Sequence, residues 1–281
     1  MVITCINQKG DKLKLGWFAP VWVKSITGLG SDFTVTTSKS NGQDGANYTG
    51  ATADIRNIVI VLDVHKEDYV EQRNRLYQFF QPRAAGTIQY SDDDVTRKTG
   101  YYVESVEPSG EGVLKNITVS LLCPNPKWYD IDEQLTELAS WEGLIEWDLE
   151  IAEEPFELTR KVNTLIGNVY NGSNVMQGLT VKFRATGEVI SPSLYNIDRQ
   201  ELMKINLTMH PGDMVIITTE TGNKRVKLIS GGETTNINNY MAYPPVWLQA
   251  YPGDNLYRYD AESGIDNLDV SIIHTQAYWG V

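Results

Sequence analysis

Three histidines are the first residues to test for chemistry, because an imidazole ring can serve as a general base or as a zinc ligand. His65, His210 and His274 are scattered, and none has the spacing of a zinc helix or of a cluster with cysteine. No Ser, His and Asp arrangement and no nucleophile elbow stands out either. The sequence therefore predicts structural roles for the histidines, with no catalytic residue, no metal site and no cofactor site.

Two groups of acidic residues could do other chemistry. The Asp triplet at 92–94 lacks the alternating ligands and the distal Glu of a calcium loop, so we interpret it as a solvated hairpin tip. Glu150, Glu153 and Glu154 could supply the paired carboxylates of a glycoside hydrolase, but acids in an acidic run are mostly solvated. That enzyme class is a minor alternative, which activity on purified cell wall would support.

The remaining reactive residue types also favour structural roles. Gly28-Leu29-Gly30 lacks the third glycine and the following helix of a nucleotide-binding loop, which predicts a turn. Cys5 and Cys123 are far apart in the chain, which predicts two buried thiols rather than a disulfide framework. No apolar run approaches the roughly 20 residues of a membrane helix, and the start of the chain does not resemble a signal peptide. We expect a protein that folds in a cytoplasm and does not bind a membrane.

Negative charge is concentrated in one segment. The formal net charge is −12, and residues 130–159 carry eleven acids with no Lys or Arg. The rest of the chain therefore totals about −1, with no basic stripe that could displace counterions from phosphates. Free binding to nucleic acid is disfavoured.

Hydrophobic periodicity predicts a mainly β first half with one helix. The Ile and Val run at 56–64 predicts a buried strand, whereas residues 39–50 are expected to form a polar, Gly-rich loop. A helix is expected near 67–80, ended by Pro82 and packed on a sheet, with Gln72 facing away from it. The expected apolar stripe of this helix consists of Tyr69, Val70, Leu76, Tyr77 and Phe80.

The second half carries a Pro-Gly-Asp turn twice, at 211–213 and 252–254. Strands are expected at 205–209 and 215–219, and Val246 and Leu248 alternate before the second turn. Repeated strand, turn, strand units predict a β-sandwich. Between the two halves, the acidic segment is expected to hold a short helix at 132–141 and the domain boundary.

Several segments, taken in their order, carry a likeness to a known family. Residues 56–60 (Arg-Asn-Ile-Val-Ile) precede the helix, and the strand at 117–123 runs into Pro124-Asn-Pro126 and Trp128. Residues 248–257 and the closing Tyr-Trp-Gly-Val at 278–281 follow in the second half. Together they resemble the distal tail protein family, a baseplate hub component of long, non-contractile-tailed bacteriophages and prophages.

The resemblance implies two domains. Residues 1–135 would form an N-terminal, ring-forming β domain that includes the helix near 67–80, with residues 271–281 returning to complete it as one option. Residues 136–270 would form a C-terminal, galectin-like β-sandwich, preceded by the acidic segment at 130–159. The expected fold class is thus mainly β, in two domains.

The resemblance also implies a structural protein rather than an enzyme. Six copies would form a ring, single or as two stacked rings, that joins the tail tube protein to the tail-tip protein and the receptor-binding protein, and DNA would pass through only as cargo. The site of action would be the virion tail tip, after synthesis and folding in the bacterial host cytoplasm. The loop at 39–50 is a candidate ring contact, because its length and glycine content suit a segment that orders on assembly.

A carbohydrate-binding β-sandwich for host-surface attachment is the main alternative. Exposed Trp or Tyr rings could stack on sugar rings, and a count of aromatic residues does not separate the two functions. The His, Asn, Arg and Trp set of galectins is not recognisable around His210 or Trp247, so no sugar site is expected there.

Overall fold

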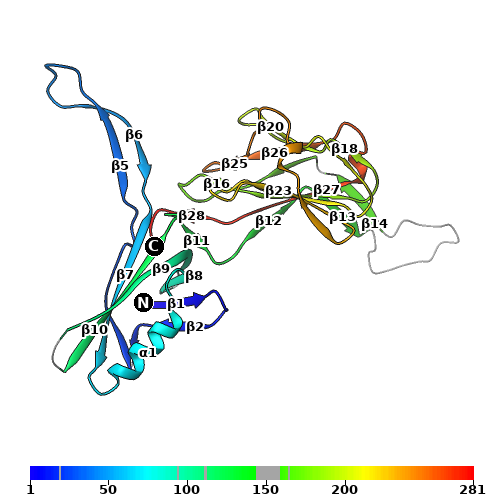
Figure 1. Cartoon of the computed structure of the whole chain (residues 1–281). Helices are drawn as coiled ribbons and strands as arrows, with labels where there is room; N and C mark the ends of the chain where they lie inside the picture. Colours follow the sequence, from blue (N-terminus) through cyan, green and yellow to red (C-terminus); the bar gives the residue numbers. More distant parts are fainter. Residues whose placement is uncertain (19, 94, 111–112, 144–158, 164) are drawn as a thin grey trace. The chain divides into compact units, whose positions relative to one another are not determined.

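The computed structural model describes residues 1–18, 20–93, 95–110, 113–143, 159–163 and 165–281. Contacts divide the chain into unit 1, Met1–Ile131 with Ala277–Val281, and unit 2, Asp132–Gln276. The sequence placed the boundaries near 135 and 271. The prediction of a mainly β fold in two parts is confirmed (Figure 1). No helix among the described residues is long and apolar enough to cross a membrane.

Unit 1 is built on an antiparallel sheet that contains ten of the described strands. The strands follow the order β2-β1-β8-β9-β10-β7-β4-β3, and β11 and β28 pair beside β9. Their bounds are β1 Val2–Asn7, β2 Lys12–Leu15, β3 Trp17–Phe18, β4 Val21–Thr27, β7 Arg56–His65, β8 Ala85–Asp92, β9 Val95–Ser109, β10 Leu114–Cys123, β11 Trp128–Asp130 and β28 Ala277–Tyr278.

The predicted buried strand at 56–64 is β7, which lies between β10 and β4. Its side chains alternate, and Ile58, Ile60, Leu62 and Val64 on one face are fully buried. They join the core of unit 1 together with side chains from β1, β10 and the helix. Asp92 at the end of β8 pairs with Val95 at the start of β9, so Asp92 and Asp93 lie at a hairpin tip as expected, and Asp94 lies outside the described residues.

The helix α1 spans Tyr69–Phe79 and contributes to the same core. Its buried residues are Tyr69, Gln72 and Leu76, whereas Val70 and Tyr77 are exposed. The predicted stripe was therefore wrong in part. Residues at i, i+3 and i+7 share a helix face, so burial of Tyr69 and Leu76 also buries Gln72. Val70 and Tyr77, one position later, then face the solvent.

The two cysteines lie in the unit 1 core as free, buried thiols, as predicted. Burial raises the pKa of Cys5 and of Cys123 to about 12, and for Cys123 the nearby Arg56 opposes part of that rise. Because the thiolate is the reactive form, we expect neither thiol of the folded chain to react with a dithiobis-nitrobenzoate reagent near pH 8. Both should react once urea unfolds the chain. Rapid labelling before unfolding would contradict this.

Unit 2 is a β-sandwich made of two sheets with a shared core. Phe183 and Ile272 from one sheet and Met203 and Tyr257 from the other belong to the same buried cluster. The six-stranded sheet has the order β12 Gln134–Glu137, β27 Leu268–His274, β17 Thr180–Ala185, β22 Met214–Thr218, β23 Arg225–Ser230 and β24 Glu233–Asn236. The four-stranded sheet has the order β15 Ile166–Asn168, β26 Leu256–Asp260, β19 Ser193–Asn196 and β20 Glu201–Lys204.

The other described elements of unit 2 are short. They are the strand pairs β13 Ala139–Gly143 with β14 Thr159–Asn163, β16 Gln177–Gly178 with β25 Gln249–Ala250, and β18 Val189–Ile190 with β21 Thr208–Met209, and the 3₁₀ helices η1 Asn238–Tyr240 and η2 Ile265–Asn267.

The two Pro-Gly-Asp sequences form turns as predicted, with Gly212 and Gly253 at φ of 92° and 90°. The strand expected at 205–209 is shorter than predicted. Leu207 N donates to Ile205 O at 3.0 Å, which turns the chain, so that only Thr208–Met209 is strand. Val246 and Leu248 also precede the strand β25 rather than form one.

The helix predicted at 132–141 is absent from the described residues. This segment contains β12 and β13 instead, and Leu138 between them is buried with its N–H donating to Val270 O at 3.0 Å. Pairing with the edge of β27 overrides the local preference of the segment. Glu150, Glu153 and Glu154, the hydrolase candidates, lie outside the described residues.

Candidate assembly surface

A hairpin of β5 Phe33–Ser38 and β6 Asn47–Ala53 extends from unit 1 (Figure 1). We call it the arm. The predicted loop at 39–50 is thus only its tip, residues 39–46, because Asn47–Gly50 pairs in β6. Among the described strands, β5 and β6 pair only with each other.

The two faces of the arm differ in composition. Phe33 pairs with Ala53, Val35 with Ala51 and Thr37 with Tyr48, so these side chains share one face. This apolar face is exposed, since Val35 is 56% and Tyr48 is 68% exposed. The opposite face carries Thr34, Thr36 and Thr52.

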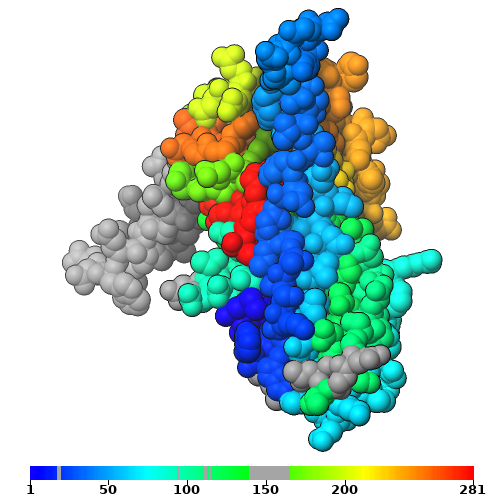
Figure 2. All heavy atoms as spheres, turned by 90° about the vertical axis from the view of Figure 1, so that its left-hand side faces the viewer, coloured from blue at the N-terminus to red at the C-terminus, as the bar shows by residue number. Residues whose placement is uncertain are grey.

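An isolated two-stranded hairpin is marginally stable in water, and an exposed apolar face adds a cost. The arm, drawn in blue in Figure 2, projects beyond the other strands of unit 1. Its apolar face therefore has the composition of a surface that becomes covered by another molecule.

Trp17 is a second exposed apolar side chain of unit 1. It is 77% exposed and lies on β3, the strand at one end of the main sheet. Edge strands offer unpaired backbone groups, and Trp is enriched at the centres of protein interfaces. The sequence pattern around Trp17 does not by itself show that this side chain is exposed.

Arg56 fixes the base of the arm. It is only 4% exposed, and its Nη1 donates to Gly28 O at 2.8 Å and Gly30 O at 2.6 Å. Its Nε donates to Pro126 O at 3.0 Å, and its Nη2 to Trp279 O at 2.8 Å. Burial lowers the pKa of Arg56, but its ordinary value is high enough to keep the guanidinium charged. Carbonyl dipoles from three segments therefore surround a buried cation.

Neighbouring side chains strengthen this junction. Ser31 Oγ accepts from Arg56 Nη2 at 2.7 Å and donates to Trp279 O at 2.7 Å. Trp128 Nε1 donates to Leu29 O at 3.1 Å, and the Arg56 guanidinium carbon lies 5.5 Å from the Trp128 ring centre. The turn at 28–31, the exit from β10 and the end of the chain are thus joined.

The last five residues complete unit 1. Tyr278 in β28 pairs with Trp128 in β11, and its hydroxyl donates to Asp130 at 3.1 Å. The Arg97 guanidinium lies 3.6 Å from the Tyr278 ring centre and donates to Gly280 O. The Trp279 ring lies 5.1 Å from the ring of Phe33, at the base of the arm.

The turn at 28–30 requires glycine at its first position. Gly28 has φ of 81°, and an added Cβ would overlap the carbonyl oxygen of Asn57. We expect Gly28→Ala to lower the stability of unit 1 by about 2–3 kcal/mol in calorimetry. Gly10→Ala is a matched control, because Gly10 also has a positive φ but open space around it, and it should cost about 1 kcal/mol. Equal losses would contradict this reading.

The histidines are not brought together. His65 in unit 1 lies edge-on to Trp22 with ring centres 5.1 Å apart, and His210 donates its backbone N–H to Asp213 in the turn. His274 is buried with Nε2 3.2 Å from Tyr170 O, and burial lowers its pKa. Within the described residues, no three His, Cys, Asp or Glu side chains are placed to hold a metal ion.

The sequence and the fold of this chain are similar to those of phage tail proteins. Residues 9–123 match the family described as phage tail protein RIFT-related domain. Over the whole chain, the structure is similar to the Dit (gp 19.1) protein of phage SPP1, with a TM-score of 0.70, 15% identity, and coverage of 99% of this chain and 100% of that one. The chain has the distal tail protein fold. The resemblance drawn from the sequence is confirmed.

Two further structures share the distal tail protein fold at low identity. They are chains of the phage P2 baseplate in its activated conformation, with Ca or with Sr, at TM-scores of 0.57 and 0.55 and identities of 11% and 10%. Each alignment covers 100% of this chain and 99% of the other. A search of curated protein sequences gave no match. The SPP1 protein is described as a hub of the adsorption apparatus in phages that infect Gram-positive bacteria.

Proposed function

We propose that this chain is a structural hub of a phage tail tip, in which six copies form a ring through unit 1. The ring would join the tail tube protein to the tail-tip and receptor-binding proteins and leave a channel for DNA. The phage tail domain at 9–123 and the distal tail protein fold support a tail-tip role. The count of six comes from the family resemblance.

The observation that carries assembly is the apolar face of the arm. Phe33, Val35 and Tyr48 are exposed on a hairpin that pairs with none of the other described strands. A second copy of unit 1 is the natural occupant, because each copy in a ring both presents an arm and receives one. Trp17 on the edge strand β3 offers a further contact for a neighbouring copy.

The junction at Arg56 gives the arm a fixed direction. Asp54 N donates to Asp32 O at 3.0 Å at the end of the arm, and the segment then enters β7 at Arg56. A hairpin with a rigid base loses less conformational entropy on docking than one on a flexible tether. This preorganisation suits a repeated contact in a closed ring.

Charge is compatible with a channel that passes DNA without holding it. Six copies carry a formal charge of 6 × −12, or −72, which repels the duplex. The excess lies in the acidic segment at 130–159, so duplex binding by the assembled ring at physiological salt would count against the channel.

Negative-stain electron microscopy of the full chain tests the proposal. We expect class averages of a six-fold ring with an open centre. Solid particles, or rings that close with a different symmetry, would contradict the hub that we propose.

A further inference from the structure

The outer face of the four-stranded sheet in unit 2 carries charged, polar and aromatic side chains that play no part in the proposed ring contact through unit 1. The register places Leu202, Tyr195 and Arg258 side by side across β20, β19 and β26. Two residues away on each strand, Lys204, Ser193 and Asp260 form a second row. Because side chains alternate along a strand, all six share the face opposite the core.

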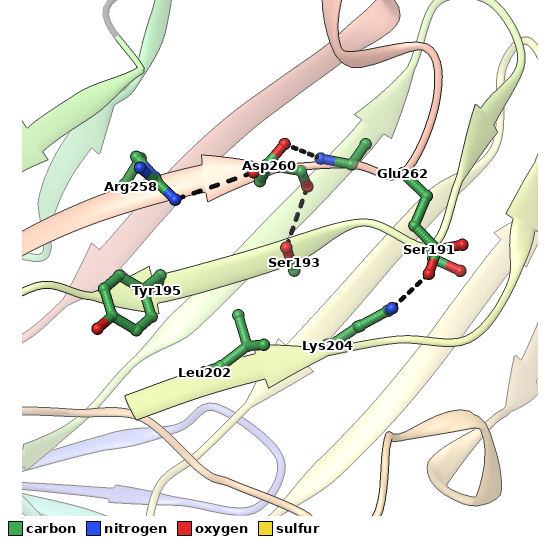
Figure 3. A pocket seen from close by; sticks show the side chains of 9 residues that line it. Ser191, Ser193, Tyr195, Leu202, Lys204, Arg258, Asp260 and Glu262 are labelled. Atoms are coloured by element: carbon green, nitrogen blue, oxygen red, sulfur yellow. Dashed lines mark hydrogen bonds and ion pairs between the residues drawn. The ribbon is translucent and has the colours of Figure 1, made fainter. Parts of the chain in front are cut away.

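These two rows line a hollow of about 400 Å³ (Figure 3). Ser193 and Ser191 are small, so the surface sinks between the larger side chains around them. Tyr195 lies at one end, and Glu262 beside Ser191 lies at the other. A volume in the range of ordinary small-molecule sites, about 300–1,000 Å³, is compatible with a ligand the size of one or two sugar rings.

The charges in the hollow are balanced. Lys204 Nζ lies 2.5 Å from Glu262 Oε1, and Arg258 Nη2 lies 4.0 Å from Asp260 Oδ2. Two cations and two carboxylates leave no net charge to attract a phosphate or a polyanion. They do provide hydrogen-bond donors and acceptors close together, beside the ring of Tyr195.

We propose that this hollow binds a neutral saccharide. A pyranose has an apolar ring face that can stack on Tyr195, and hydroxyl groups that both donate and accept hydrogen bonds. The Asp260 and Glu262 carboxylates would accept from hydroxyls, and Arg258 and Lys204 would donate to them. Ser193 Oγ, which donates to Asp260 O at 3.3 Å, would accept. A neutral, polar ligand fits this lining better than an anion or a purely apolar molecule does.

The Glu262 carboxylate suits binding rather than cleavage. A glycoside hydrolase needs one carboxylic acid that stays protonated near neutral pH. Hydrogen bonds from Lys204 and Ser191, together with the charge of Lys204, lower the pKa of Glu262. Glu262 therefore remains an acceptor and does not supply that acid while it is paired with Lys204.

This site goes beyond the role of the ring. A hub that also binds a neutral saccharide would contact the host surface through unit 2 itself. Neither His210 nor Trp247, around which no sugar site was expected, lines the hollow. Failure of saccharide binding would leave the ring proposal intact, since the two rest on different units.

Ligand-observed saturation-transfer NMR on the full chain tests the proposal, because the method tolerates a large assembly. The probes are the methyl glycosides of glucose, galactose, N-acetylglucosamine and N-acetylgalactosamine, with inorganic phosphate as the anionic comparison. We expect saturation transfer to at least one glycoside. Tyr195→Ala and Asp260→Asn should each raise its Kd at least tenfold, about 1.4 kcal/mol.

Two variants complete the design. Tyr195→Phe keeps the ring and should retain binding, and Tyr170→Ala removes an exposed tyrosine of the same unit that does not line the hollow. Absence of saturation transfer to all four glycosides would overturn the proposal. So would binding that survives both Tyr195→Ala and Asp260→Asn, or competition by phosphate at lower concentration than the glycosides.

Discussion

Deletion of the arm, residues 33–53 replaced by a short Gly-Ser link, should abolish ring formation while leaving unit 1 folded. The arm pairs with no other described strand, and most of its side chains are exposed, so its removal costs unit 1 few buried contacts. We expect the assembled species to disappear from size-exclusion chromatography with light scattering. The calorimetric transition of unit 1 should move by no more than about 4 °C, equivalent to about 1 kcal/mol.

Point variants separate the faces of the arm. Val35→Asp places a charge on the apolar face, whereas Thr36→Asp places the same charge on the opposite face. A contact through the apolar face predicts that Val35→Asp disrupts assembly and Thr36→Asp is tolerated. Assembly that survives both Val35→Asp and deletion of the arm would show that the ring closes elsewhere.

Replacing Arg56 with Leu should destabilise unit 1 by about 3–5 kcal/mol, because it leaves buried carbonyls without donors. Those acceptors are Gly28, Gly30, Pro126 and Trp279. Differential scanning calorimetry should show the unit 1 transition lowered by about 10 °C or more. The unit 2 transition should stay in place.

Arg56→Lys is the matched control for charge. Lys keeps the cation but lacks the planar fork that serves several acceptors at once, so an intermediate loss is expected. If Lys restored full stability, charge alone would explain the junction. If Leu cost less than about 1 kcal/mol, the hydrogen bonds of Arg56 would contribute little net stability.

Local sequence patterns correctly predicted the strand and the turns that depend on neighbouring residues alone. The Ile and Val run of β7 buried one face as its alternation required, and Gly212 and Gly253 took the positive φ of their turns. The helix predicted in the acidic segment was wrong, because part of this segment pairs with the edge of β27. That partner lies more than 130 residues away in the sequence. Such pairing is not visible in a short window of sequence.

The candidate surfaces depend even more on distant contacts. Arg56 gains its role from carbonyls at 28–30, 126 and 279, which only the folded sheet brings together. The hollow in unit 2 is assembled by the register of β19, β20 and β26. Glycine content and length made residues 39–50 a candidate ring contact, which stays a prediction. They did not show that the apolar residues flanking this tip share one face.

The mass of the full chain in solution tests the ring most directly. Six chains of 31.6 kDa give 6 × 31.6, or 189.6 kDa, and two stacked rings give twice that value. Size-exclusion chromatography with light scattering should report one of these masses, and Val35→Asp should shift it toward a single chain. A 31.6 kDa species at every concentration tested would contradict a ring that unit 1 closes by itself.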